Sequence, residues 1–167
     1  MCTTENKKDQ MSDNDFMSEA LRQAKVAYDK NEVPVGAVLV KDGMIISRGY
    51  NLRETNSSAV SHAEICAIED ACKVLGTWRL DECVLYVTLE PCPMCSGAII
   101  NSRIKKVVFG TKDNLAGCCG SVLNVNNYPF NHSFEIVGGV KETECAEMLS
   151  DFFKKKRNTN KSEKNEI

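Results

Sequence analysis

Three residues with metal-binding side chains stand out by their spacing, and they fall in two short segments. His62 opens the segment His-Ala-Glu at 62–64, whereas Cys92 and Cys95 belong to the segment Pro-Cys-Pro-Met-Cys at 91–95. Neutral imidazole and thiolate are ligands that zinc prefers. One histidine with two cysteines leaves a fourth tetrahedral position open, as a catalytic zinc site requires. The residue types therefore predict a catalytic zinc ion held by His62, Cys92 and Cys95.

Glu64 adds an acid–base group to these predicted ligands, because it follows His62 by two positions. Zinc lowers the pKa of bound water towards neutrality, which makes hydroxide available at the pH of a cell. A carboxylate beside the metal, but not bound to it, can accept the water proton and deliver it to a leaving group. The combination H-x-E and P-C-x-x-C is the signature of zinc deaminases. We therefore predict hydrolytic deamination with Glu64 as the catalytic residue.

Each part of this pattern also has a simpler explanation. Ser61 and Glu64 have the spacing of a capping box, in which the Glu64 carboxylate only accepts a hydrogen bond from the backbone N–H of Ser61. The two cysteines alone could form a thioredoxin-like redox pair or half of a closed structural zinc site. A fourth ligand for such a closed site could come from four other residues: Cys66, Cys118, Cys119 or His132. The conjunction of both segments favours the catalytic site.

The elements that must position these residues alternate between helices and strands. Hydrophobic periodicity and turn residues predict helices from Ser12 or Asp13 to about 28, and over 62–75, 93–102 and 142–157. Strands are predicted over 35–41, 44–50, 83–88, 106–110 and 134–140, with a tight turn at Asp42-Gly43 between the first two. This order predicts a three-layer α/β/α sandwich with a mixed five-stranded sheet. His62 and Cys92 would then lie at two helix starts, where the helix dipole favours thiolate.

Length and composition limit the class of protein. The chain has 167 residues, of which 43% are hydrophobic and 26% charged, as in an ordinary globular domain. Its longest apolar run, at 33–40, is far shorter than the roughly 20 residues of a membrane-spanning helix. The polar start lacks a secretory hydrophobic segment. We therefore expect a cytoplasmic protein with no membrane partner, built as one domain over residues 12–157 with flexible ends at 1–11 and 158–167.

The charge of the chain is informative about a binding partner only in one basic segment. The net charge of −2 provides no global basic field for nucleic acid. Residues 152–167, however, hold six Lys or Arg and two Glu. From charge alone, a solvated helix end is the better explanation of this basic segment. The nine cysteines are an odd number without a secretory signal, which favours reduced thiols over a disulfide framework.

At these residues the chain resembles the tRNA-specific adenosine deaminases of the cytidine deaminase-like superfamily, over about residues 12–157. Besides the zinc motif, the matching segments are VPVGAV at 33–38, GYN at 49–51, SRI at 102–104, VVFG at 107–110, Asp113, Gly117, Gly120-Ser121, Asn131-His132 and SDFF at 150–153. The zinc motif marks the superfamily, whereas the stretch from Ser102 onward marks the tRNA branch. Cys118 and Cys119 depart from the small residues more common there.

The resemblance implies a homodimer of α/β/α domains, with one Zn²⁺ per subunit, that converts the wobble adenosine of a tRNA anticodon stem-loop to inosine. It implies that Glu64 moves a proton from water to the flipped adenine and then to the departing ammonia. It places Asn51, the backbone of Ala63 and Asp113 beside the target nucleotide. It also makes the basic helix end a phosphate contact and Phe153 a surface on which a loop base stacks.

Two other functions stay open at this point. A deaminase of a free base or nucleoside, such as cytosine, cytidine or guanine, would use the same zinc chemistry with a different pocket. A non-catalytic zinc-binding module would keep the metal and lack turnover. The net negative charge favours a small substrate, whereas the match through the last helix and the basic end of that helix favour tRNA.

Overall fold

A mixed five-stranded sheet forms the centre of the computed structural model, which describes residues 11–164 and their side chains as far as Thr159. The strands are β1 (Gly36–Lys41), β2 (Met44–Tyr50), β3 (Val84–Leu89), β4 (Lys106–Thr111) and β5 (Glu135–Gly138). Their order in the sheet is β2-β1-β3-β4-β5. Strand β1 pairs antiparallel with β2 and β3, whereas β3, β4 and β5 run parallel. The predicted mixed sheet is therefore confirmed.

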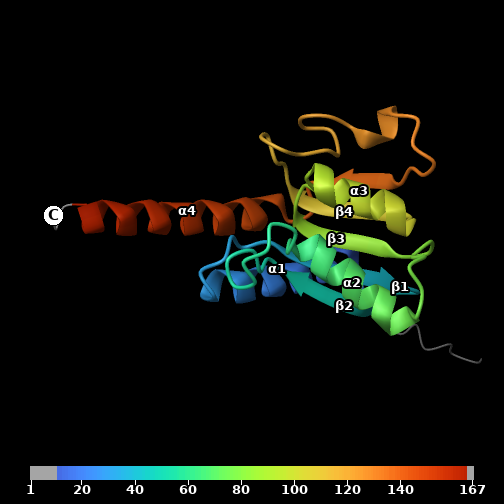
Figure 1. The fold of residues 1–167 in the computed structure, drawn as a ribbon, viewed down its shortest axis with the longest axis horizontal. Helices are drawn as coiled ribbons and strands as arrows, with labels where there is room; N and C mark the ends of the chain where they lie inside the picture. Colours follow the sequence, from blue (N-terminus) through green and yellow to red (C-terminus); the bar gives the residue numbers. More distant parts are fainter. Residues whose placement is uncertain (1–10, 165–167) are drawn as a thin grey trace, which may run out of the picture.

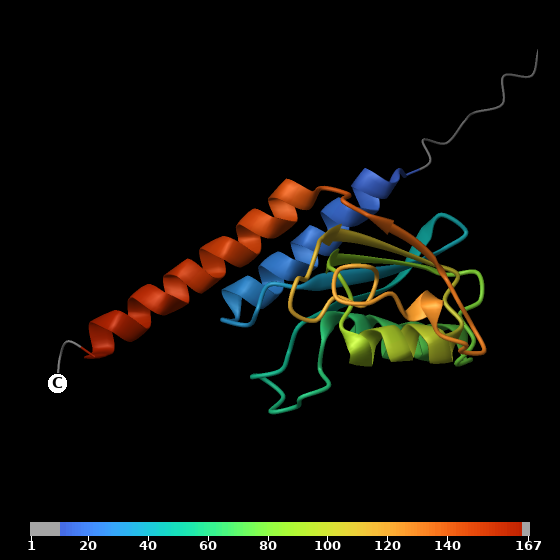
Figure 2. The ribbon, with the colours of Figure 1, turned by 90° about the horizontal axis from the view of Figure 1, so that it is seen from above.

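Helices cover both faces of this sheet (Figure 1). Helices α2 (Ala63–Leu75) and α3 (Pro93–Ser102) lie on one face, and α1 (Asp13–Asp29) and α4 (Glu142–Lys164) lie on the other (Figure 2). Side chains alternate between the two faces along each strand, so that Leu39 packs in the core beneath α2 and α3 while Val38 packs in the core beneath α1. The predicted α/β/α sandwich is confirmed.

Local sequence signals explain most of the element boundaries. Helix α1 starts at a capping box, in which the Ser12 side chain accepts from the backbone N–H of Asp15 and the Asp15 side chain accepts from that of Ser12. The hairpin between β1 and β2 turns at Asp42 and Gly43, with φ of 50° and 73°. Two successive positive φ angles suit the twist of a two-residue hairpin. Helix α2 ends before Gly76, whose φ is 65°.

Helix α4 is longer than the sequence pattern indicates. It continues seven residues beyond the expected end at 157, to Lys164, and projects past the edge of the sheet (Figures 1 and 2). No Gly or Pro lies between Glu142 and Lys164 to stop it. The expectation of a flexible N-terminal end falls mostly on residues 1–10, which lie outside the described residues. Among the helices that are described, none has the length and apolar character needed to span a membrane.

Candidate metal centre and substrate pocket

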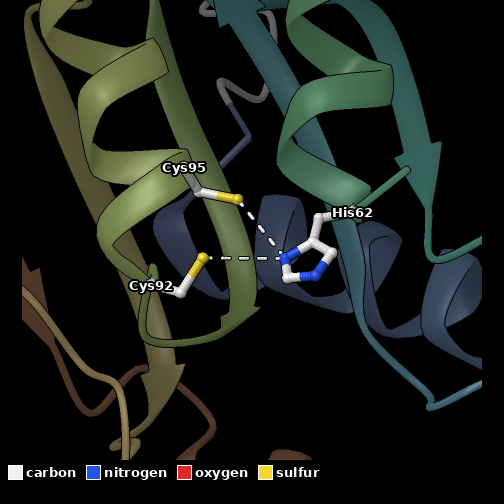
Figure 3. A group of neighbouring side chains, drawn as sticks. All are labelled: His62, Cys92 and Cys95. Atoms are coloured by element: carbon white, nitrogen blue, oxygen red, sulfur yellow. Dashed lines mark hydrogen bonds between the residues drawn. The ribbon is translucent and has the colours of Figure 1, made fainter. Parts of the chain in front are cut away.

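The starts of α2 and α3 bring the predicted metal ligands together. His62 is the N-cap of α2 and Cys92 is the N-cap of α3, and neither side chain makes a capping hydrogen bond. Pro93 occupies the first turn of α3, where its missing N–H costs nothing. Cys95 lies in the first turn of α3, on the side that faces His62 (Figure 3). The two helix starts therefore point three ligand side chains at one place.

The spacing of these three side chains fits a zinc ion. Nδ1 of His62 lies 3.7 Å from Sγ of Cys92 and 3.6 Å from Sγ of Cys95. All three ligand atoms lie within 4.8 Å of one another. Tetrahedral zinc, with Zn–S bonds of about 2.3 Å and Zn–N bonds of about 2.0–2.1 Å, places a nitrogen and a sulfur about 3.6 Å apart. The chain thus holds a His-Cys-Cys metal-binding group whose shape and chemistry match those of zinc deaminases.

The three side chains of this group shift one another's pKa values. The hydrogen bond with Cys95, together with that to His62, lowers the pKa of the Cys92 thiol to about 4. The contact with the Cys92 sulfur raises the pKa of the His62 imidazole. The hydrogen bond between Cys95 and Cys92, together with burial, raises the pKa of the Cys95 thiol far above that of a free thiol. One thiolate and one thiol therefore face the imidazole, and a bound metal ion would take the place of the remaining protons.

Glu64 lies in the first turn of α2 and is only 4% exposed. Burial raises the pKa of its carboxyl group from 4.5 to about 7. The capping-box explanation of this residue is wrong, because the N-cap is His62 and the backbone N–H of Ser61 donates to the carbonyl oxygen of Ser58 at 3.3 Å. A carboxyl group that titrates near neutrality can both accept and release a proton at the pH of a cell.

A pocket beside the metal-binding group contains most of the other predicted site residues. Asn51, Ala63 and Asp113 line it together with His62, Glu64 and Cys92. Sequence reasoning missed five further lining residues: Val33, Val35, Arg53, Leu89 and Glu90. Phe153 is not among the lining residues; it lies on α4 with 42% of its surface exposed and its ring 5.5 Å from that of Phe152.

Two polar residues of this pocket are held by short local contacts. The Asn51 amide donates to the carbonyl oxygen of Val33 at 3.3 Å, and its Oδ1 accepts from the backbone N–H of Arg53 at 3.3 Å. The Asp113 Oδ1 accepts from the backbone N–H groups of Leu115 and Ala116 at 2.9 and 3.1 Å. Both side chains are therefore ordered before any ligand enters, which reduces the entropic cost of binding.

None of the candidate fourth ligands joins the metal-binding group in the part of the chain that the structure describes. His62, Cys92 and Cys95 form the group without them. Nε2 of His132 instead lies 2.8 Å from the carbonyl oxygen of Ile104, and Cys118 and Cys119 are buried in the core beneath α3. Cys92 and Cys95 are free cysteines rather than a disulfide. The described residues therefore leave one coordination position open on a tetrahedral ion.

Comparison with known proteins agrees with this site. The model of the MafB19-like deaminase family matches residues 11–157. The chain is 53% identical to the tRNA-specific adenosine deaminase of Bacillus subtilis (strain 168) over 148 residues, which span 88% of this chain and 92% of that protein. This chain belongs to the tRNA-specific adenosine deaminases of the MafB19-like family. Identity to the relative from Aquifex aeolicus is 49% over 144 residues, covering 86% of this chain and 95% of that protein.

Two solved structures share the fold of this chain. One comes from work on A-to-I editing by tRNA:A34 deaminases at the wobble position of transfer RNA, with a TM-score of 0.78 and 41% identity over 80% of this chain and 98% of that chain. Guanine deaminase from Bacillus subtilis has a TM-score of 0.59 and 43% identity, over 61% and 66% of the two chains. The same architecture therefore serves enzymes with different amino-purine substrates.

Proposed function

We propose that this protein is a zinc-dependent deaminase that converts the wobble adenosine of a tRNA anticodon to inosine. The observation that carries the proposal is the pairing of a metal-binding group with Glu64, a buried carboxyl group whose pKa is about 7, in one pocket. The tRNA substrate is supported by relatives that are named as tRNA-specific adenosine deaminases and match nearly their whole length. An enzyme that acts on tRNA is expected in the cytoplasm.

Each residue of the pocket has a defined part in this reaction. His62, Cys92 and Cys95 would hold one zinc ion per subunit, which supplies the activation of a water molecule when it is bound. Glu64 accepts a proton from the attacking water and delivers it to the ring nitrogen of adenine, and then assists the departure of ammonia. The balance is adenosine and water giving inosine and ammonia. Asn51 and the backbone of Ala63 orient the flipped base beside Glu64.

The RNA outside the pocket requires other contacts. Asp113 lies at the rim of the pocket and is proposed to contact the target nucleotide and its neighbours. Residues 154–157 carry four consecutive basic side chains, all exposed on α4. They are proposed to contact phosphates of the anticodon stem-loop. The exposed ring of Phe153 precedes them on the same helix and is proposed to stack with a base of the loop.

We further propose that the protein is a homodimer, in which a second copy covers an apolar groove beside α3. The groove is lined by residues of α3 and of the segment that follows β4, among them Ile100, Leu123 and Val125. Tyr128 and Phe130 border it and are 52% and 56% exposed. Large exposed apolar patches mark interaction surfaces. Light scattering should give the mass of a dimer for the wild type and of a monomer for Phe130→Glu; a monomeric wild type would contradict the proposal.

The experiment that tests the function is nucleoside mass spectrometry on the zinc-loaded protein. It is incubated with an anticodon stem-loop that carries a wobble adenosine, and in parallel with free adenosine, cytidine and guanine. Inosine formed from the stem-loop alone is the expected result. The likeness to guanine deaminase makes a free-purine deaminase the second candidate. Deamination of a free base or nucleoside without inosine in the stem-loop would support that candidate and reject the tRNA substrate.

A further inference from the structure

One buried carboxylate of the pocket has no part in the reaction described above. Glu90 follows β3, lies two residues before Cys92 and is only 2% exposed. Its carboxylate accepts four hydrogen bonds, and all four donors belong to the segment 113–121. Oε2 accepts from the backbone N–H of Asp113 at 3.0 Å and from the Ser121 hydroxyl. Oε1 accepts from the backbone N–H groups of Cys119 and Ser121 at 2.9 and 3.1 Å.

The segment 113–121 is wrapped closely around this carboxylate. A Cβ atom added to Gly117 would lie 2.4 Å from Oε2 of Glu90, so only glycine fits at that position. The backbone N–H of Cys118 donates to the carbonyl oxygen of Pro91 at 2.9 Å. Glu90-Pro91 and the loop therefore form one hydrogen-bonded unit. Since a buried carboxylate needs donors around it, the loop and Glu90 stabilise each other in a single arrangement.

This unit connects a metal ligand to a residue at the rim of the pocket. Glu90 is joined to Cys92 through Pro91, and its carboxylate holds the backbone of Asp113 directly. The other hydrogen bonds of Asp113 are local, since its side chain accepts from Leu115 and Ala116 and its carbonyl oxygen accepts from Gly117, so they fix it only relative to its own loop. We propose that Glu90 is a positioning residue for deamination, which sets the distance between Asp113 and the metal ligand Cys92. The proposal rests on the proposed function, because Asp113 matters there as a contact to the nucleotide.

A second buried carboxylate provides a matched control. Glu32 is 1% exposed and accepts from the backbone N–H groups of Glu54 and Thr55 at 3.2 and 2.6 Å. It therefore holds the loop that follows Asn51, and these two hydrogen bonds do not involve the segment 113–121. A Glu→Gln change at either position replaces one acceptor oxygen with an amide that donates, and this amide then faces backbone N–H groups. The two variants should disturb different loops by the same chemistry.

The first test is hydrogen exchange measured by mass spectrometry on zinc-loaded protein. Glu90→Gln should speed exchange in peptides that contain residues 113–121 and leave those over 52–61 unchanged. Glu32→Gln should show the reverse pattern. Equal exchange of 113–121 in wild type and Glu90→Gln would overturn the proposal. This readout does not depend on turnover, so a wild type that forms no inosine would reject the proposed function separately.

The second test is a double-mutant cycle on kcat/KM for the stem-loop, with zinc content and melting temperature measured for each variant. Glu90→Gln and Asp113→Asn should each reduce kcat/KM by roughly 10-fold, and the double variant should lose little more than the worse single variant. Glu32→Gln combined with Asp113→Asn should instead multiply the two losses. If the losses of Glu90→Gln and Asp113→Asn also multiply, Glu90 does not act through Asp113 and the proposal fails.

A milder variant keeps the test decisive where Glu90→Gln does not fold. Ser121→Ala removes one donor to Glu90 and leaves the carboxylate in place. It should reduce kcat/KM by roughly 2- to 5-fold at full zinc content, and its loss should not multiply with that of Asp113→Asn. A loss of melting temperature with kcat/KM unchanged would show that the contact serves stability alone, and would overturn the positioning role.

Discussion

The metal centre and the rim of the pocket are held in place by different devices. The ligands of the metal centre project from the first turns of two helices, and their positions follow from the packing of α2 and α3 on the sheet. The rim consists of the loop that follows Asn51 and the segment 113–121. The buried carboxylate of Glu32 holds the first loop, and that of Glu90 holds the second. The comparison indicates that the ligands and the rim loops are held by different contacts. Glu90 sets the spacing between the two regions, but loss of a ligand should leave the rim loops intact.

The largest effect is expected when a ligand of the metal centre is removed, and it distinguishes that centre from the rim most clearly. Cys92→Ala removes one of three ligands, so bound zinc should fall well below one ion per chain and inosine formation should be lost. The rim should keep its structure, because Glu90 and its loop donors are unchanged. Elemental analysis gives the zinc content, and hydrogen exchange of 113–121 reports on the rim. Full zinc content in Cys92→Ala would show that the ligand set is wrong.

A change in the rim should reduce activity and leave zinc binding unchanged. Asn51→Ala removes an amide that is 5% exposed and lines the pocket, so kcat/KM for the stem-loop should fall by roughly 10- to 100-fold. Zinc content should stay that of the wild type, since Asn51 is not part of the metal-binding group. Steady-state kinetics and elemental analysis on one preparation decide the matter. A loss of zinc in this variant would mean that the two regions are not separable.

A smaller effect concerns RNA contacts outside both regions. Replacing residues 154–157 with glutamine removes four positive charges from an exposed part of α4. The affinity for the stem-loop should fall, and the slope of log affinity against log salt should become shallower by about 1 for each phosphate contact that is lost. Fluorescence anisotropy at several salt concentrations measures this slope. A slope identical to that of the wild type would exclude these side chains as phosphate contacts.

The smallest effect is expected at the end of α4. A chain that ends at residue 157 should differ from the full chain by only about 0.5 kcal/mol or less in free energy of unfolding, because the described side chains at the end of this helix are exposed. Phe152→Ala is the contrast: its ring is 3% exposed and lies 5.6 Å from that of Tyr28, so about 3–5 kcal/mol should be lost. Urea unfolding measures both. Equal stabilities would show that α4 is not packed on α1.

The metal centre can be predicted from the sequence because its ligands lie in two short segments with recognisable residue types and spacing. His62, Glu64, Cys92 and Cys95 have the required residue types at close spacing, and each segment starts a helix whose boundaries are marked by local residues such as Pro93 and Gly76. Local signals also explain why the predicted ends of the strands and of the hairpin lie within one or two residues of the observed ends. The last strand is predicted less well, since the pattern extends over 134–140 whereas β5 covers only Glu135–Gly138.

The contacts that hold the rim could not be predicted, because they join distant residues. Glu90 binds donors 23 to 31 positions further along the chain, and three of the four are backbone N–H groups, which every residue but proline carries. Glu32 reaches 22 and 23 positions to Glu54 and Thr55 in the same way. One weak signal was present for Glu90: a charged residue stands between an apolar strand and the predicted metal ligand. The position of Phe153 outside the pocket also depends on how α4 packs, which the sequence pattern does not specify.

The most direct measurement compares the wild type with Glu64→Gln, with inosine and zinc determined on the same samples. The change keeps the size of the side chain and removes its ability to take up and release a proton. The account predicts one zinc ion per chain in both proteins, inosine from the stem-loop with the wild type, and none with Glu64→Gln. Inosine formed by Glu64→Gln at the rate of the wild type would contradict the account, because the proton would then travel by another group.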